Sequence, residues 1–486
     1  MADKLTPQQQ MAVTSRGGKL LVSAAAGSGK TKVLVDRLLG FLTQEHDPAN
    51  LDEFLIITYT KAAASELRGK IAAKLTEEIA RQPENRHLQR QMQRLFLTEI
   101  STVHGFCSDL LREYAYKLDI AADFRVADEN ECREIRETVL EGLLDRAYET
   151  AGDDPDFRAF VDTQGVGRSD RQVPELVEKV YDSAHCHLNP EAWLDKCLTD
   201  AEAEGIGDAG ETVWGQYLIR DFREYLDCQM AVLRQCAESA DSCPGLEKPA
   251  VTLRDALYQL EQLRACTTWD DIAAKRELCF GSLRFPTKNN PDPELTERIK
   301  AAWSACKDGL RKKLVGFSND SAQVLADLHQ TAAAQRGLVA LVRQFDRDYS
   351  AAKRSRRVLD FGDLEHKTLD LLLGKSRSQP TVAAREIGRR YREIMVDEYQ
   401  DSNGVQDAIF EALTREKQNC FMVGDVKQSI YRFRLADPGI FLEKYEKYVP
   451  ARQAEPGQGR KILLSHNFRS GAEVIDAVND VFHTCM

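Results

Sequence analysis

The sequence predicts an α/β fold in which a parallel sheet is interrupted by a large helical insertion. Two apolar runs near the N-terminus, 20–22 and 54–58, are each followed by a helical pattern, and this alternation is typical of parallel sheets. The strand signal fades from about residue 121 to 350, where apolar residues recur at helical spacing, and it returns after 351. One sheet is therefore expected to be assembled from two separate parts of the chain.

The chain divides into four segments according to this alternation. After residue 351, apolar strands at 394–396 and 420–423 restore the α/β pattern. A final strand at 461–464 follows a link rich in Pro, Gly and Gln. We expect this final strand to open a second sheet that has no further strands, so that the chain ends as a truncated protein would. The predicted organisation is 1–120 as the first part of the first sheet domain, 121–350 as a helical insertion, 351–447 as the second part of the first domain, and 448–486 as the truncated start of a second sheet domain.

The composition is that of a folded protein of the cell interior. The 486 residues are 43% hydrophobic and 29% charged, as in soluble globular chains. No apolar stretch approaches the ~20 residues that cross a bilayer, and the N-terminus lacks the apolar core of a signal peptide. Twelve cysteines occur without a Cys-x-x-Cys pair, as expected for reduced thiols. We therefore expect a cytoplasmic protein with no membrane partner.

The charge balance bears on nucleic-acid binding. With 66 Lys and Arg against 77 Asp and Glu, the net charge of −11 disfavours indiscriminate binding to nucleic acid. A local basic channel is still compatible with it. The runs 353–357 and 385–392 are candidates, although such runs more often form a solvated face.

A glycine-rich loop stands between the first strand and the first helical pattern. Gly27 and Gly29 allow a tight turn that points backbone N–H groups at a phosphate, at the positive end of the following helix. Lys30 would then reach the β- and γ-phosphates, and Thr31 would hold Mg²⁺. The predicted cradle consists of Ala24, Ala25, Ala26, Gly27, Ser28, Gly29, Lys30 and Thr31, with Ala24 where the usual pattern has glycine.

A pair of carboxylates follows the strand at 394–396. Asp397 suits the Mg²⁺ shell, and Glu398 suits polarising an attacking water, which together cover much of what phosphoryl transfer needs. Carboxyl ends of parallel strands meet at one edge of a sheet, so we expect Lys30 to lie near both carboxylates. The alternative is a surface acidic turn.

Other polar and aromatic segments also follow predicted strands. Gln9, just before the first strand, has an amide that both donates and accepts hydrogen bonds and can therefore recognise adenine. Gln428 is placed to sense a γ-phosphate. Aromatic rings interleaved with cations suit single-stranded nucleic acid, because bases stack on rings while cations neutralise phosphates. Taken singly, each ring is more readily explained as core packing. The candidate DNA-binding residues are Tyr59, Thr60, Lys61, His104, Tyr431, Phe433 and Arg434.

In this order the motifs resemble those of the UvrD-like DNA helicases of superfamily one. The resemblance implies RecA-like P-loop NTPase domains, ATP and Mg²⁺, and 3′-to-5′ movement on single-stranded DNA with unwinding of double-stranded DNA. It also implies that Phe468 stacks on adenine and that Arg469 reaches the γ-phosphate from a second sheet domain. The matching segments are 5–9, 24–31, 57–68, 101–107, 359–364, 396–401, 424–434 and 465–470.

Within that family, segment 423–438 is most similar to the A subunits of AddAB helicase–nucleases. This resemblance implies a heterodimer with a B-type subunit, a role in recombinational repair of double-strand breaks, and a nuclease domain that would follow Met486. Two alternatives stay open. One is a stand-alone repair helicase without nuclease, and the other is an ATP-gated DNA-binding scaffold that has lost its motor function.

Overall fold

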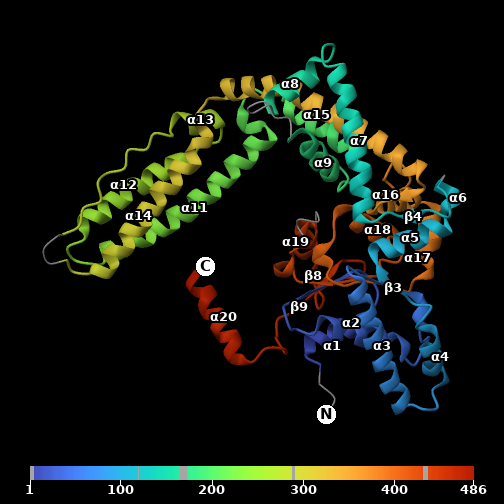
Figure 1. The fold of residues 1–486 in the computed structure, drawn as a ribbon. Coiled ribbons are helices and arrows are strands. Elements are labelled where there is room, and N and C mark those ends of the chain that lie inside the picture. Colours follow the sequence, from blue (N-terminus) through green and yellow to red (C-terminus); the bar gives the residue numbers. More distant parts are fainter. Residues whose placement is uncertain (1–4, 119, 165–171, 287–289, 431–435, 486) are drawn as a thin grey trace. The chain divides into compact units, whose positions relative to one another are not determined.

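The computed structural model describes residues 5–118, 120–164, 172–286, 290–430 and 436–485. The chain forms two compact units (Figure 1). The first contains residues 1–143, 176–191 and 344–486, and the second contains 144–175 and 192–343. The first unit is a mixed α/β structure around a parallel sheet, whereas the described residues of the second form helices and loops and include no strand.

The sheet of the first unit has seven strands in the order β3-β2-β6-β7-β1-β9-β8, and every neighbouring pair is parallel. Strands from the two ends of the chain are thereby interleaved, because β6 and β7 lie between β2 and β1. The prediction of one parallel sheet built from both sides of the insertion is confirmed. The strands are β1 Leu20–Ala24, β2 Phe54–Thr58, β3 Glu99–Thr102, β6 Glu393–Val396, β7 Cys420–Gly424, β8 Val449–Pro450 and β9 Arg460–Leu464, and a separate pair joins β4 Arg125–Val126 to β5 Val358–Leu359.

The last strand corrects one prediction. We expected the strand at 461–464 to open a second sheet, but β9 pairs with β1 along its whole length, from Leu20 opposite Arg460 to Ala24 opposite Leu464. The physical reason is that Ile462 and Leu464 are buried in the same core cluster as Leu20 and Ala24. The short apolar strand therefore completes the first sheet.

Alternate residues of each strand face opposite sides of the sheet, and each side has its own core. Leu21, Leu55 and Ile57 belong to one cluster, whereas Leu20 and Ile56 belong to the other. Both faces are therefore covered by helices, as a parallel sheet requires. The first face is covered by α5 Val103–Glu113, α16 Phe361–Leu373, α17 Val382–Arg390, α18 Gly404–Thr414 and α19 Pro438–Lys447, and the second by α1 Pro7–Thr14, α2 Lys30–Leu42, α3 Lys61–Arg81 and α4 Arg86–Arg94.

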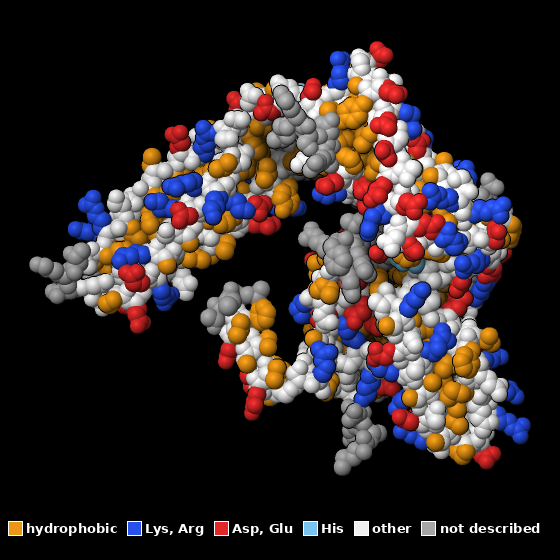
Figure 2. All heavy atoms as spheres, viewed as in Figure 1, with side chains coloured by type: hydrophobic (Ala, Val, Ile, Leu, Met, Phe, Trp, Pro, Cys, Tyr) orange, Lys and Arg blue, Asp and Glu red, His pale blue; other side chains and the backbone are white. Residues whose placement is uncertain are grey.

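The remaining elements of the first unit are α6 Ala115–Leu118, α20 Ala472–Cys485 and the 3₁₀ turns η1 Leu51–Glu53, η4 Tyr399–Asp401 and η5 Val426–Gln428. All of them are short except the last helix, α20. One face of α20 is apolar and exposed (Figure 2), with Val474, Val478, Val481 and Phe482 each about half exposed.

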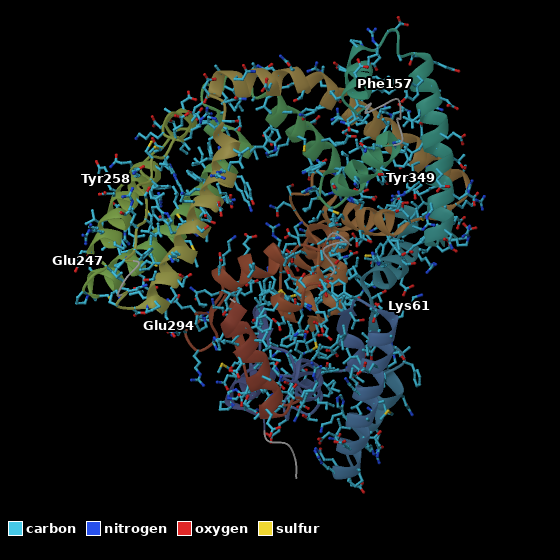
Figure 3. The ribbon with its side chains drawn as sticks, turned by 60° about the vertical axis from the view of Figure 1, so that its left-hand side comes forward. Lys61, Phe157, Glu247, Tyr258, Glu294 and Tyr349 are labelled. Carbon is cyan, nitrogen blue, oxygen red and sulfur yellow. The ribbon has the colours of Figure 1, made fainter. Side chains whose placement is uncertain are left out.

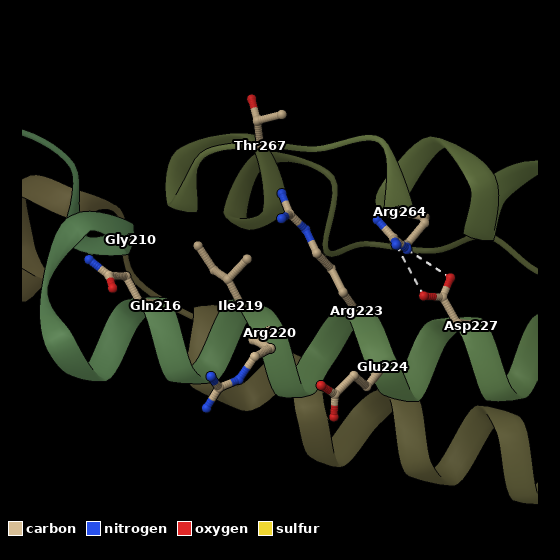
Figure 4. Close-up of a pocket in the computed structure, with 9 residues that line it drawn as sticks. All are labelled: Gly210, Gln216, Ile219, Arg220, Arg223, Glu224, Asp227, Arg264 and Thr267. Atoms are coloured by element: carbon tan, nitrogen blue, oxygen red, sulfur yellow. Dashed lines mark hydrogen bonds and ion pairs between the residues drawn. The ribbon is translucent and has the colours of Figure 1, made fainter. Parts of the chain in front are cut away.

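The second unit has a core of its own between long helices. It also has a pocket of about 370 Å³ beside α11 (Figure 4). There Arg264 forms a bidentate ion pair with Asp227, with distances of 2.7 and 3.0 Å. Arg223 donates a hydrogen bond to the Cys266 carbonyl at 2.7 Å. The elements of this unit are α8 Pro155–Gln164, α11 Val213–Asp241, α12 Glu247–Arg264, α13 Trp269–Ala274, α14 Pro293–Leu314, η2 Ala209–Glu211 and η3 Val315–Phe317. Four further helices have residues in both units, namely α7 Glu129–Glu149, α9 Gln172–Ala184, α10 Pro190–Glu202 and α15 Ser321–Ser355.

Among the described residues, none of the helices combines the length and the apolar character that spanning a membrane demands. Each cysteine whose side chain the structure describes is a free thiol.

Candidate active site

The glycine loop has the predicted strand–loop–helix setting. β1 ends at Ala24 and α2 begins at Lys30, while Gly27 and Gly29 have left-handed backbones with φ of +71° and +83°. The Ser28 hydroxyl is buried and has no hydrogen-bond partner in the protein. A loop of this shape with an unused buried hydroxyl fits a phosphate ligand.

Gly27 gives a first test of this loop. Gly27→Ala should destabilise the protein, because a left-handed backbone costs a non-glycine residue ~1–2 kcal/mol and the added Cβ would lie 2.6 Å from Asn467 Oδ1. We expect a lower melting temperature and a smaller stabilisation by Mg²⁺-ATP in thermal denaturation. The matched control is Gly69→Ala on α3, where nothing lies within 4 Å of an added Cβ. Equal effects of both variants would contradict this account of the loop.

Lys30 lies where the carboxyl ends of the strands meet. Its Nζ is 2.6 Å from Glu398 Oε2 and 3.4 Å from Gln428 Oε1. Glu398 follows β6, and the neighbouring Asp397 donates its backbone N–H to the Ile57 carbonyl of β2 at 2.9 Å. The predicted proximity of Lys30 and Glu398, which are 368 positions apart in the chain, is confirmed.

The carboxylates of Asp397, Glu398 and Asp401 are crowded together near Lys30. Burial, together with the charge of Glu398, raises the pKa of Asp397 to about 6 and that of Asp401 to about 6. Asp401 Oδ1 is also buried without a hydrogen-bond partner. Glu398 itself has a left-handed backbone with φ of +51°, which is uncommon for a residue with a side chain. Such crowded carboxylates would be stabilised by a cation.

These residues fit Mg²⁺ in particular. Mg²⁺ is usually held by one or two carboxylates together with waters and substrate phosphates, rather than by a complete protein cage. Among the described residues, no group of three or more His, Cys, Asp or Glu side chains that could hold a metal ion is found. Asp397 and Thr31, the second residue of α2, are the predicted ligands.

A further amide holds the acidic cluster in place. Gln400 Nε2 donates to Glu398 Oε2 at 3.0 Å and to Asp401 Oδ2 at 3.2 Å, and Gln400 Oε1 accepts the Asp425 backbone N–H at 2.9 Å. In turn Asp425 Oδ2 accepts Gln428 Nε2 at 2.8 Å, which leaves the Gln428 oxygen facing Lys30. Sequence reasoning gave no role to Gln400, Asp401 or Asp425, although Asp425 directly follows β7 and the other two lie in the turn after β6.

The predicted adenine-reading residue is already engaged by the protein. Gln9 is 4% exposed, its Nε2 donates to the Ser28 carbonyl at 3.0 Å, and its Oε1 accepts the Thr6 backbone N–H at 2.9 Å. Gln9 therefore connects the start of α1 to the phosphate loop.

Phe468 and Arg469 also lie beside this loop. The Phe468 N–H donates to the Gly27 carbonyl at 2.9 Å, its ring is 61% exposed, and the Arg469 side chain is exposed. We expected both to approach from a second sheet domain. In the structure they follow β9 of the first sheet directly, because β9 pairs with β1.

The predicted DNA-binding residues divide into those at strand ends and those outside the described residues. Tyr431, Phe433 and Arg434 are outside. Thr60 caps α3 by accepting the Ala63 N–H at 3.0 Å, and Lys61 is exposed at the first residue of α3 (Figure 3).

Tyr59 and His104 make specific side-chain contacts. The Tyr59 ring is partly buried against the core, and its hydroxyl forms a hydrogen bond with Ser402 Oγ; burial raises its pKa. The His104 ring stacks on Phe361 with 4.4 Å between centroids, and its Nε2 lies 3.0 Å from Glu365 Oε1. Sequence reasoning did not single out Phe361, Glu365 or Ser402.

A phosphate loop facing strand-end carboxylates on a parallel sheet is the arrangement typical of P-loop nucleotide-binding proteins. Residues 5–449 match the family model for the UvrD/REP helicase N-terminal domain, and the chain therefore belongs to the UvrD/REP helicase family.

Individual relatives carry a more specific description, as A subunits of ATP-dependent helicase/nucleases. The chain is 38% identical to the one from Pelotomaculum thermopropionicum, over 100% of this chain and 39% of that protein. It is 38% identical to the one from Moorella thermoacetica, over 98% of this chain and 34% of that protein. For the Listeria welshimeri relative the identity is 35%, over 99% of this chain and 39% of that protein. The chain thus spans little more than a third of the length of these relatives.

Proposed function

We propose that this chain is the motor part of an ATP-driven DNA helicase. The observation that carries the proposal is the 2.6 Å contact between Lys30 of the phosphate loop and Glu398 after β6, at the shared carboxyl edge of one parallel sheet. The unpartnered Ser28 hydroxyl and Asp401 carboxylate oxygen beside this pair support a ligand with both phosphates and a cation.

The roles follow from the charges. The loop N–H groups and Lys30 would bind the phosphates of ATP, and Asp397 with Thr31 would hold Mg²⁺, which neutralises phosphate charge when bound. Glu398 would orient and polarise the attacking water. Gln428 is placed to detect the γ-phosphate, since its amide oxygen is 3.4 Å from Lys30 Nζ. Phe468 and Arg469 would contribute a base stack and a further cation.

The wider assignment rests on the relatives. Their description as A subunits of ATP-dependent helicase/nucleases supports a helicase–nuclease component with at least one further subunit. We propose that this partner is a B-type subunit and that the complex acts in double-strand-break repair. We propose 3′-to-5′ movement, a RecA-like sheet domain, and a second such domain that begins after β9. None of the residues of this chain is assigned to a nuclease.

Glu398→Gln tests the proposal. Removing the charge next to the attacking water while keeping the cradle should leave ATP affinity within about threefold and slow hydrolysis on the order of 10²-fold or more. Affinity can be measured with a fluorescent ATP analogue, and hydrolysis by single-turnover assays with and without single-stranded DNA.

Glu411→Gln is a suitable control, because Glu411 forms ion pairs with Lys19 and, at 2.8 Å, with Lys444, and neither lysine belongs to the phosphate loop. Normal hydrolysis by Glu398→Gln would refute its role. ATP binding without hydrolysis in the unmodified protein would favour the scaffold alternative.

A further inference from the structure

A six-residue segment, 398–403, begins at the nucleotide site and is hydrogen-bonded to Tyr59 directly and to His104 through Glu365. It begins with Glu398, which is paired with Lys30 at 2.6 Å. The 3₁₀ turn η4 follows at once and is closed by hydrogen bonds from Asp401 N to the Glu398 carbonyl at 2.9 Å and from Ser402 N to the Tyr399 carbonyl at 3.1 Å. These two hydrogen bonds tie Glu398 to Ser402 within one short turn.

One branch leads from this turn to Tyr59. Ser402 is fully buried, and its hydroxyl forms a hydrogen bond with the Tyr59 hydroxyl. The Ser402 carbonyl also accepts the Asp437 N–H at 3.0 Å. Ser402, at the end of η4, is therefore joined directly to the Tyr59 side chain.

A second branch leads to His104. Asn403 Nδ2 donates to Glu365 Oε2 at 3.3 Å, and Gln406 Nε2 donates to Glu365 Oε1 at 2.7 Å. The same Glu365 oxygen lies 3.0 Å from His104 Nε2. Although burial alone raises the pKa of Glu365, its hydrogen bonds from His104 and the two amides lower it, so the buried carboxylate stays charged and holds all three partners.

The contact between Lys30 and Glu398 is one that a bound nucleotide would change. In the structure Lys30 is paired with Glu398, whose backbone is left-handed with φ of +51°. A γ-phosphate would compete for Lys30 and release Glu398, which removes one of the contacts that hold this backbone in place. A small change at η4 is then transmitted through packed and hydrogen-bonded groups.

We propose that Ser402, Asn403 and Glu365 are positioning residues that couple nucleotide binding at Lys30 to the placement of Tyr59 and His104 for single-stranded DNA. This inference rests on the proposed function and adds the route between its two sites. Ser402 governs the Tyr59 branch, and Asn403 with Glu365 governs the His104 branch.

The test measures the affinity of a fluorescently labelled oligo(dT) by anisotropy, with and without a non-hydrolysable ATP analogue and Mg²⁺. The ratio of the two affinities reports the coupling, and we expect about 5- to 150-fold in the unmodified protein. Ser402→Ala and Glu365→Gln should each reduce the ratio by at least threefold while analogue affinity stays within about twofold. If Ser402→Ala does not fold, Tyr59→Phe replaces it as the test of the same hydrogen bond. This variant removes only the hydroxyl and should also lower the ratio.

Thr414→Val is the matched control. It removes a hydroxyl that is as buried as that of Ser402, on the last turn of α18, where Thr414 Oγ1 donates to the Phe410 carbonyl at 2.8 Å. The control should lower the melting temperature without changing the ratio. The coupling inference would be overturned, with the proposed function left intact, if the variants had an unchanged ratio. The same holds if the unmodified protein bound both ligands without coupling. Failure of the unmodified protein to bind the analogue and the oligonucleotide would overturn the proposed function as well.

Discussion

Lys30→Ala should reduce ATP hydrolysis by about 10³-fold or more. Lys30 is the one cationic side chain in the loop sequence from 23 to 31, and its Nζ is within 2.6 Å of the proposed general base. Without it, negative charge that develops on the transferred phosphate loses its nearest counter-charge. Single-turnover hydrolysis with and without single-stranded DNA measures the loss.

Stability separates this effect from misfolding. The side chain of Lys30 is 12% exposed and that of Glu398 is 40% exposed, so breaking the pair leaves a carboxylate that water can reach. We therefore expect the free energy of unfolding to change by no more than ~1 kcal/mol. Lys74→Ala is the control, because it breaks an exposed ion pair with Glu77 on α3 at 2.9 Å. Hydrolysis by Lys30→Ala at the rate of this control would refute the phosphate-binding role.

The sequence was sufficient to predict the meeting of Lys30 and Glu398. Each residue follows an apolar strand closely, and the carboxyl ends of parallel strands share an edge, so no knowledge of side-chain packing was needed. The same reasoning assigned the last strand to a second sheet, which is wrong, because β9 pairs with β1. An apolar alternation such as that of Ile462 and Leu464 indicates a strand with one buried face, but it carries no information about which sheet accepts it.

Side-chain networks were harder to predict than strand ends. The basic run at 353–357 is a candidate DNA-binding patch by sequence, yet Lys353 is 2% exposed and pairs with Asp360 at 2.8 Å and Asp363 at 2.7 Å. Likewise the Tyr59 hydroxyl finds its partner 343 positions away in Ser402. Such partners are fixed by tertiary packing, which hydrophobic periodicity does not report.

A buried ion pair behind the phosphate loop has the largest expected effect on stability. Arg37 of α2 is 0% exposed and Glu393 of β6 is 3% exposed. The guanidinium donates to Glu393 Oε2 at 2.7 Å and Oε1 at 2.5 Å, and to the Ala12 carbonyl of α1 at 2.7 Å. Arg37 therefore joins the helix of the phosphate loop to the strand that carries Asp397.

Arg37→Met should destabilise the protein by about 3–5 kcal/mol, because it leaves the Glu393 carboxylate buried and unpaired. The double variant Arg37→Met/Glu393→Leu should recover most of this loss, since apolar side chains of similar volume can replace a buried pair at little cost. Urea unfolding, followed by a probe in the sheet unit, measures both. Arg94→Met is the control, because Arg94 and Asp52 are about 40% exposed and such pairs contribute ~0–1 kcal/mol. If Arg37→Met were no worse than this control, the buried pair would not be what holds α2 to β6, and the position of Lys30 would have to be attributed to packing alone.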